Sequence, residues 1–214
     1  MIYYDKHKAR LVARGFVRKA GIDYEQSFSP TPKLGSIILL IMMANKNSWI
    51  INQLDVKSAF LNGTLDYPVY CRPPEGLKIP SGSVLMLKKA LYGLQEAGRQ
   101  WFEKYKEVVL NFGYKQGEGE LCYFHYGSGL KSSHIIIYVD DQIITGDNDL
   151  VNQTIIELEK HFEMTKSKGM SSFLGIEFMK KKGFMNMYQP GSIESIIEKF
   201  EMKEAKPGCT IPLL

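Results

Sequence analysis

The chain has 214 residues, 44% of them hydrophobic, which is enough to bury a substantial core in one large domain or two small ones. The longest apolar run, 37–44, is far shorter than the roughly 18 to 20 residues that a membrane span needs, and no secretory signal opens the chain. The three cysteines are odd in number and lack the close paired spacing of a zinc site, so they indicate neither a disulfide framework nor a structural metal. We expect a globular intracellular protein with no membrane partner.

The formal net charge is only +4, but its distribution is uneven. Over residues 1–19 a single acid, Asp5, stands among the bases Lys6, Lys8, Arg10, Arg14, Arg18 and Lys19. Such a cationic patch suits a polyanionic partner. A charge run by itself is more often the solvated face of an amphipathic element, and both interpretations stay open here.

The hydrophobic pattern of the N-terminal half mixes strands with one helix. A segment rich in proline separates two of the expected strands, and the helix is apolar on every side, as a buried helix would be. The expected elements are a strand at 8–16, a helix from Gly35 and Ser36 to about residue 44, a strand at 49–55, an extended or irregular segment at 67–80 and a short strand at 84–88.

The C-terminal half carries the clearest periodic segments. They predict a helix at 96–112 ended by Gly113, a hairpin of strands 134–137 and 143–145, a helix at 150–162, a strand at 172–178 with a glycine inside it, and helical spacing over 193–200. Strands and helices do not alternate regularly, and no repeat or linker divides the chain. We therefore predict an α+β fold in one continuous unit.

Adjacent aspartates, Asp140 and Asp141, fall in the break of the predicted hairpin. Neighbouring residues of a regular strand point to opposite faces, so the two carboxylates can share a site only at a turn or bulge. Hard divalent cations with oxygen ligands offset the repulsion between them, and Asp55, at the end of another strand, supplies a third acid. Aspartate also favours turns for conformational reasons alone, which leaves a purely structural interpretation open.

A family resemblance rests on five ordered motifs. Tyr138-Val139-Asp140-Asp141 resembles the Tyr-x-Asp-Asp box of reverse transcriptases. Four further segments resemble the copia branch of that family: KARLVARGF at 8–16 with GIDY at 21–24 and FSP at 28–30, QLDVKSAFLNG at 53–63, LYGLQEAGR at 91–99 followed by Trp101, and FLGIE at 173–177. The chain thus resembles the reverse transcriptase domain of a copia-type (Ty/copia) LTR retrotransposon.

The resemblance implies an α+β right-hand polymerase consisting of fingers and palm. An antiparallel palm sheet would bear the Tyr-x-Asp-Asp hairpin, and the thumb would be largely absent. The implied division assigns residues 1–50 and 64–92 to the fingers, 51–63 and 93–185 to the palm, and 186–214 to the start of the thumb. A polymerase without its thumb should grip a duplex poorly.

The resemblance also implies a role for each candidate site residue. Asp55 and Asp140 would bind two Mg²⁺ ions, for which Mn²⁺ can substitute, with the Val56 carbonyl as a further ligand and Asp141 completing the acidic cluster. Nucleotide binding would fall to Lys8, Arg10 and Arg14, which share one face of the first strand, to Phe60 beneath the incoming sugar, and to Tyr92 and Gly93. Leu174 and Gly175 would hold the primer end.

The implied partners are an RNA or DNA template with its primer, deoxynucleoside triphosphates and the rest of a Pol polyprotein, in the cytoplasm within a virus-like particle or in the nucleus. Copia-type elements commonly have lysine then glutamine near Gln95 and Glu96, and proline is frequent at the position of Gly98. We expect the acid at position 96 to weaken slightly a surface that faces nucleic acid. Three interpretations remain: a polymerase core, taken from a polyprotein or a genomic remnant; an inert or domesticated fragment that binds nucleic acid through 8–19; and a structural domain whose acids only make turns.

Overall fold

The computed structural model describes residues 9–181 and 184–205, and the chain divides into two compact units, Met1–Lys168 and Gly169–Leu214. The expectation of a single continuous unit is therefore wrong. The boundary is a bend at Gly169, whose φ of +84° a glycine adopts without strain. The connection from β8 to β9 is only three residues long, 169–171, and has no linker composition, which is why the sequence did not reveal it.

The first unit is built on a six-stranded sheet in which every pair is antiparallel, with the order β4-β5-β6-β7-β1-β8. Strands β1, β6 and β7 confirm the three predicted from branched apolar runs, whereas β4, β5 and β8 were not predicted. The strands are β1 (Ile51–Val56), β4 (Lys115–Gln116), β5 (Tyr123–Ser128), β6 (Lys131–Tyr138), β7 (Asp141–Gly146) and β8 (Met164–Lys168).

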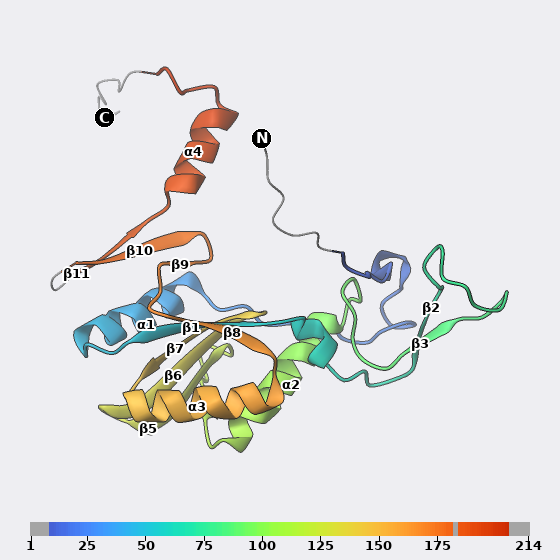
Figure 1. The fold of residues 1–214 in the computed structure, drawn as a ribbon, viewed down its shortest axis with the longest axis horizontal. Coiled ribbons are helices and arrows are strands. Elements are labelled where there is room, and N and C mark those ends of the chain that lie inside the picture. The colour runs from blue at the N-terminus through green and yellow to red at the C-terminus, as the bar shows by residue number, and fades with distance from the viewer. Residues whose placement is uncertain (1–8, 182–183, 206–214) are drawn as a thin grey trace. The chain divides into compact units, whose positions relative to one another are not determined.

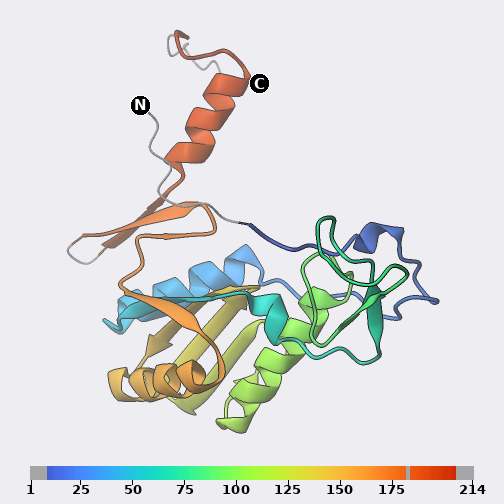
Figure 2. The ribbon, with the colours of Figure 1, turned by 45° about the vertical axis from the view of Figure 1, so that its right-hand side comes forward.

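Helices cover both faces of this sheet. Helix α1 (Leu34–Lys46) lies on one face, and α2 (Ala97–Asn111) and α3 (Asn148–His161) lie on the other (Figures 1 and 2). All three confirm predicted helices. The expected burial of α1 on every side is wrong, because Leu39 and Met42 are 58% and 62% exposed and only one side of the helix is buried.

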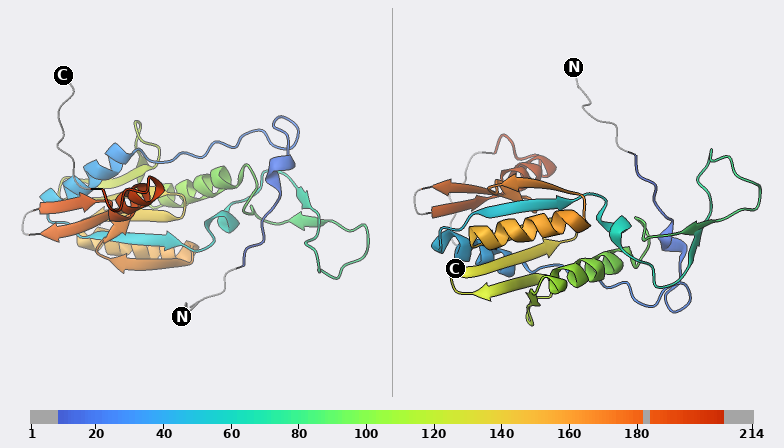
Figure 3. Two further views of the ribbon diagram at one scale, coloured as in Figure 1. Left: turned by 90° about the horizontal axis from the view of Figure 1, so that it is seen from above. Right: turned by 60° about the horizontal axis from the view of Figure 1, so that its bottom comes forward.

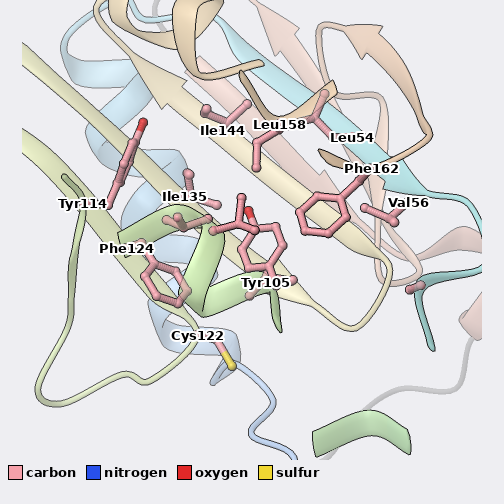
Figure 4. Packing of buried hydrophobic residues seen from close by; sticks show 14 of the residues in the cluster. Leu54, Val56, Tyr105, Tyr114, Cys122, Phe124, Ile135, Ile144, Leu158 and Phe162 are labelled. Atoms are coloured by element: carbon pink, nitrogen blue, oxygen red, sulfur yellow. The ribbon is translucent and has the colours of Figure 1, made fainter. Parts of the chain in front are cut away.

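The main core lies between the sheet and helices α2 and α3, and Figure 4 shows its aromatic centre around Tyr105 and Phe162. The Trp101 ring meets Phe162 edge-on at a centroid distance of 5.0 Å. Gly113, with φ +87°, follows the end of α2 as predicted. The Asp147 side chain caps α3 by accepting hydrogen bonds from the next helical amides. Both of these helix ends lie at the end of the sheet away from the β6–β7 turn, because Asp147 follows the last residue of β7 and Gly113 contacts Tyr126, which pairs with Ser133.

An arm of two short strands, β2 (Val69–Cys71) and β3 (Leu85–Leu87), extends beyond the end of the sheet where β1 leads into the 3₁₀ helix η2 (Ala59–Asn62) (Figure 3). The predicted strand at 84–88 is confirmed. The predicted strand at 8–16 is wrong in its described part, which is irregular up to the short helix η1 (Gly15–Val17).

The N-terminal segment is not a strand because it has no partner ladder. Among the described residues, one backbone hydrogen bond ties residues 9–14 to another segment, from the Ala13 amide to the Tyr92 carbonyl at 2.8 Å. Glycines allow this contact to be close: a Cβ on Gly15 would lie 1.8 Å from the Gly93 carbonyl oxygen, and one on Gly93 would lie 2.1 Å from that of Ala13. The glycines therefore serve the packing of two loops.

The second unit contains a three-stranded sheet of order β11-β10-β9 and one helix. Its elements are β9 (Ser172–Phe173), β10 (Ile176–Lys181), β11 (Phe184–Tyr188) and α4 (Pro190–Lys199). The helix confirms the spacing over 193–200. The single strand predicted at 172–178 is wrong, because Leu174 and Gly175 have φ of +51° and +77° and form a two-residue turn between β9 and β10.

The fold class is mixed, with antiparallel sheets and few helices, as the sequence predicted. None of the helices in residues 9–181 and 184–205 is long and apolar enough to cross a membrane.

Candidate active site

A two-residue turn, Val139–Asp140, joins β6 to β7, and Tyr138 faces Asp141 across it. The turn separates the environments of the adjacent acids, because Asp140 lies in the loop and Asp141 is the first residue of β7. The prediction that the pair lies at a hairpin turn is confirmed. Val139 has φ +56°, which is sterically costly for a β-branched side chain. Strained backbone of this kind gathers at functional sites.

The neighbouring strand β1 brings the third acid to this turn. Asp55 stands opposite Asp141 in the β1–β7 register, and the Val56 amide donates to the Asp140 carbonyl at 2.9 Å. On its other side Asp55 stands opposite Thr165 of β8, whose hydroxyl donates to the Asp55 carboxylate at 3.4 Å. Residues far apart in the sequence are thus assembled by strand pairing at one end of the sheet.

The three carboxylates affect one another electrostatically. Burial raises the pKa of Asp141, and the negative charges of Asp140 and Asp55 raise it further, against a smaller lowering by a hydrogen bond with Gln53. All three aspartates are half-buried, so solvent screens their repulsion only in part. A cation placed among them would remove that repulsion.

The donor set matches the chemistry of a hard divalent cation. Three carboxylates, with backbone carbonyls beside them, are the oxygen ligands that Mg²⁺ and Mn²⁺ prefer. In the part of the chain that the structure describes, no three acidic, histidine or cysteine side chains are close enough to hold one metal ion. Metal binding would therefore have to draw the carboxylates of Asp55, Asp140 and Asp141 together.

Three of the candidate nucleotide-binding side chains lie together beside these acids. The Tyr92 ring contacts Phe60 at a centroid distance of 4.4 Å, and the Arg10 guanidinium lies over the same ring at 5.4 Å. Burial raises the pKa of Tyr92, and the charge of Asp140 raises it further; the Arg10 cation lowers it in part, and Asp55 adds the smallest increase. The Phe60–Tyr92–Arg10 group is therefore within electrostatic reach of the carboxylates.

The other predicted site residues are placed differently. Lys8 lies outside the described residues. Arg14 is exposed, and the argument that it shares a strand face with Arg10 fails because this segment is not a strand. Gly93 meets the backbone of the N-terminal segment, as described above. Leu174 and Gly175 form the β9–β10 turn in the second unit, so the expected primer-grip strand is a hairpin.

The chain matches, over residues 2–214, the family model described as reverse transcriptase (RNA-dependent DNA polymerase). The chain belongs to this reverse transcriptase family. The predicted family is thereby confirmed, and the copia-type assignment is supported by relatives from plant and yeast transposons.

Three relatives of this reverse transcriptase domain come from plant and yeast transposons. The retrovirus-related Pol polyprotein from transposon TNT 1-94 of Nicotiana tabacum is 35% identical over 96% of this chain and 16% of its own length. That from transposon RE1 of Arabidopsis thaliana is 35% identical over 96% of this chain and 14% of its length. The transposon Ty1-DR4 Gag-Pol polyprotein of Saccharomyces cerevisiae is 29% identical over 92% and 12% respectively. The chain thus spans less than a fifth of each polyprotein.

Two features of this reverse transcriptase domain were missed from sequence. Trp101 of α2 donates its indole N–H to the Val139 carbonyl at 2.6 Å, although its helical spacing indicated only a core residue. Glu96 was expected on a surface facing nucleic acid, and this is wrong: it is 2% exposed and its carboxylate accepts two hydrogen bonds of 2.6 Å from Arg18. No local pattern could have paired residues so far apart in the sequence.

Proposed function

We propose that this chain is the catalytic core of a copia-type RNA-directed DNA polymerase that transfers nucleotides by a two-metal mechanism. The observation that carries the proposal is the β1–β7 register, which sets Asp55 opposite Asp141, together with the hydrogen bond that joins Val56 to Asp140. Phosphoryl transfer needs carboxylates converging on one end of a rigid sheet, and a hairpin alone would not provide the third acid.

The anatomy that follows assigns 51–63 and 93–185 to the palm, 1–50 and 64–92 to the fingers, and 186–214 to the start of the thumb. The six-stranded sheet with two helices on one face supports the palm assignment, because it is the rigid layer from which the acidic turn projects. The β2–β3 arm supports the fingers assignment. The β9–β10 turn at Leu174 and Gly175 would present backbone groups to the primer end.

In this mechanism the chain mainly positions charge. Asp55, Asp140 and the Val56 carbonyl would hold two Mg²⁺ ions, with Asp141 completing the cluster. The bound ions would supply activation of the primer 3′-hydroxyl and neutralisation of the leaving pyrophosphate. Arg10 would contact the triphosphate, with the Tyr92 ring limiting its rotation. Deoxynucleoside triphosphates and an RNA or DNA template with primer are the substrates.

Phe60 would select deoxyribose by excluding a 2′-hydroxyl. Its contact with Tyr92 holds the ring in place. A fixed ring excludes the 2′-hydroxyl by steric clash, whereas a mobile ring would move aside and admit it. Phe60→Val should raise incorporation of ribonucleotides relative to deoxynucleotides.

The deciding experiment is extension of a DNA primer on an RNA template with deoxynucleotides and Mg²⁺ or Mn²⁺. Asp140→Asn should abolish extension, whereas the matched control Asp149→Asn, which removes an exposed carboxylate beyond the opposite end of β7, should leave it intact. Absence of extension by the unmodified chain would refute the proposal. Salt-sensitive binding to the same primer-template without extension would favour an inert fragment that only binds nucleic acid.

A further inference from the structure

The Val139–Asp140 turn has two backbone carbonyls, and a different element holds each of them. The Val139 carbonyl accepts the indole N–H of Trp101 from α2 at 2.6 Å. The Asp140 carbonyl accepts the Val56 amide from β1 at 2.9 Å. The turn is therefore tied on one side to the helix layer and on the other to the strand that carries Asp55.

These ties are needed because the turn conformation is unfavourable by itself. Two-residue hairpin turns with positive φ are usually built from glycine, asparagine or aspartate. Here the residue with φ +56° is Val139, whose branched side chain disfavours that region. A conformation of this kind persists only where the surrounding structure fixes it.

The donor on α2 is itself rigid. Trp101 is 1% exposed and packs edge-on against Phe162 at 5.0 Å. One helical turn further on, the Tyr105 hydroxyl donates to the Gln142 side-chain oxygen at 2.6 Å, next to Asp141 on the outgoing strand. Helix α2 thus holds the chain both before and after the adjacent aspartates.

We propose that Trp101 is a positioning residue for Asp140 and Asp141: its indole N–H holds the Val139 carbonyl and thereby keeps the turn in the left-handed conformation that sets the two aspartates beside Asp55. The catalytic consequence rests on the function proposed above, but the structural consequence does not. Loss of the N–H leaves the Val139 carbonyl without a donor and frees the turn to change conformation, which weakens the Val56–Asp140 hydrogen bond.

The test replaces the indole N–H without changing the shape of the ring. Incorporation of 3-benzothienylalanine in a Trp49→Phe background puts sulfur in place of the N–H at position 101 alone, because the chain has only 2 tryptophans. A second variant, Trp101→Phe, is made in the same background. Hydrogen exchange of the Val56 amide reports the turn directly, and the adjacent Lys57 amide, which donates to the Glu163 carbonyl at 2.9 Å, serves as an internal control.

The matched control variant is Tyr114→Phe. It also removes one buried polar group, a hydroxyl that bonds to Ser133 and Thr154 at 2.7 and 2.8 Å, but it does not touch the turn. We expect the Val56 amide to exchange about tenfold faster in the benzothienylalanine protein, with the exchange rate of the Lys57 amide unchanged. In Tyr114→Phe, the exchange of both amides should change only as much as the loss of global stability predicts. The dissociation constant of Mn²⁺, titrated alone, should rise about tenfold with the Trp101 variants only.

Unchanged exchange of Val56 in the benzothienylalanine protein would overturn the proposal, as would equal acceleration in Tyr114→Phe. If the unmodified chain binds no Mn²⁺ and extends no primer, the proposed function fails, whereas the Val56 exchange still decides the role of Trp101. The two failures are therefore distinguishable.

Discussion

The buried ion pair between Arg18 and Glu96 allows a sharp test of how the N-terminal segment is held. Their side chains are 13% and 3% exposed and the closest nitrogen–oxygen distance is 2.6 Å. Replacing Glu96 by methionine leaves a guanidinium with little access to water, and we expect a loss of about 3 kcal/mol, the lower end of the range for breaking a buried pair because Arg18 keeps some exposure. Arg18→Met should cost a similar amount.

The double variant Arg18→Met/Glu96→Met should recover most of this loss and unfold within about 1 kcal/mol of the unmodified chain, because two apolar side chains of similar length fill the same space without an unpaired charge. Urea unfolding followed by tryptophan fluorescence measures all four proteins. The exposed pair Lys104–Glu107, 2.9 Å apart with 35% and 60% exposure, is the control, and its coupling should stay below about 0.5 kcal/mol.

Additive losses in the double variant would refute this reasoning. They would mean that each side chain is stabilised by separate contacts, and that the buried charge of one is not offset by the other.

Three further outcomes follow from the described contacts. Glu120→Gln should lower the free energy of unfolding by about 1 kcal/mol, because its carboxylate accepts hydrogen bonds of 2.9 Å from the Lys33 amide and the Ser36 hydroxyl at the start of α1; an unchanged urea midpoint would contradict this. Burial, with a smaller effect of His125, lowers the pKa of His134 below 6.5. The neutral imidazole therefore contributes to the free energy of unfolding above pH 6.5, and this contribution should be lost as the pH falls below that value. His134→Asn should make the free energy of unfolding depend less on pH in this range. Burial raises the pKa of the Cys122 thiol to about 12, so an alkylating reagent should leave Cys122 unmodified in the native protein and label it in urea, as peptide mass spectrometry would show.

Local patterns predicted the elements whose hydrophobicity and periodic spacing are those of a buried strand or an amphipathic helix. The β6–β7 hairpin was predictable because the isoleucines on either side of the acids are branched, apolar and interrupted by a short polar break. Helix α2 was predictable because its aromatic residues recur at helical spacing. Strand β5 was missed because Tyr123–Ser128 ends in polar and small residues that read as a loop. It is a strand because β6 offers it a partner over six residue pairs.

The errors have a common cause in pairing that the local sequence does not encode. The segment at 9–16 was predicted as a strand, but in its described part it has no neighbouring strand to pair with. The run at 172–178 is interrupted by Leu174 and Gly175, and leucine with a positive φ is not expected from composition. Gly175 was therefore misinterpreted as a glycine inside a strand, which indicates close approach of another backbone. A two-residue turn was the better interpretation.

The candidate site shows the same division between what is local and what is assembled. Asp55, Asp140 and Asp141 were identifiable because carboxylates carry the chemistry and their motifs are short. Their geometry depends on contacts that no motif contains: the strained turn is held by Trp101 from α2 and by Val56 from β1. The strain at Val139 is therefore evidence about those distant contacts, because a valine with φ +56° would relax if either carbonyl of the turn lost its donor. A substitution in α2 that never touches a carboxylate should consequently change the site more than many substitutions on the hairpin itself.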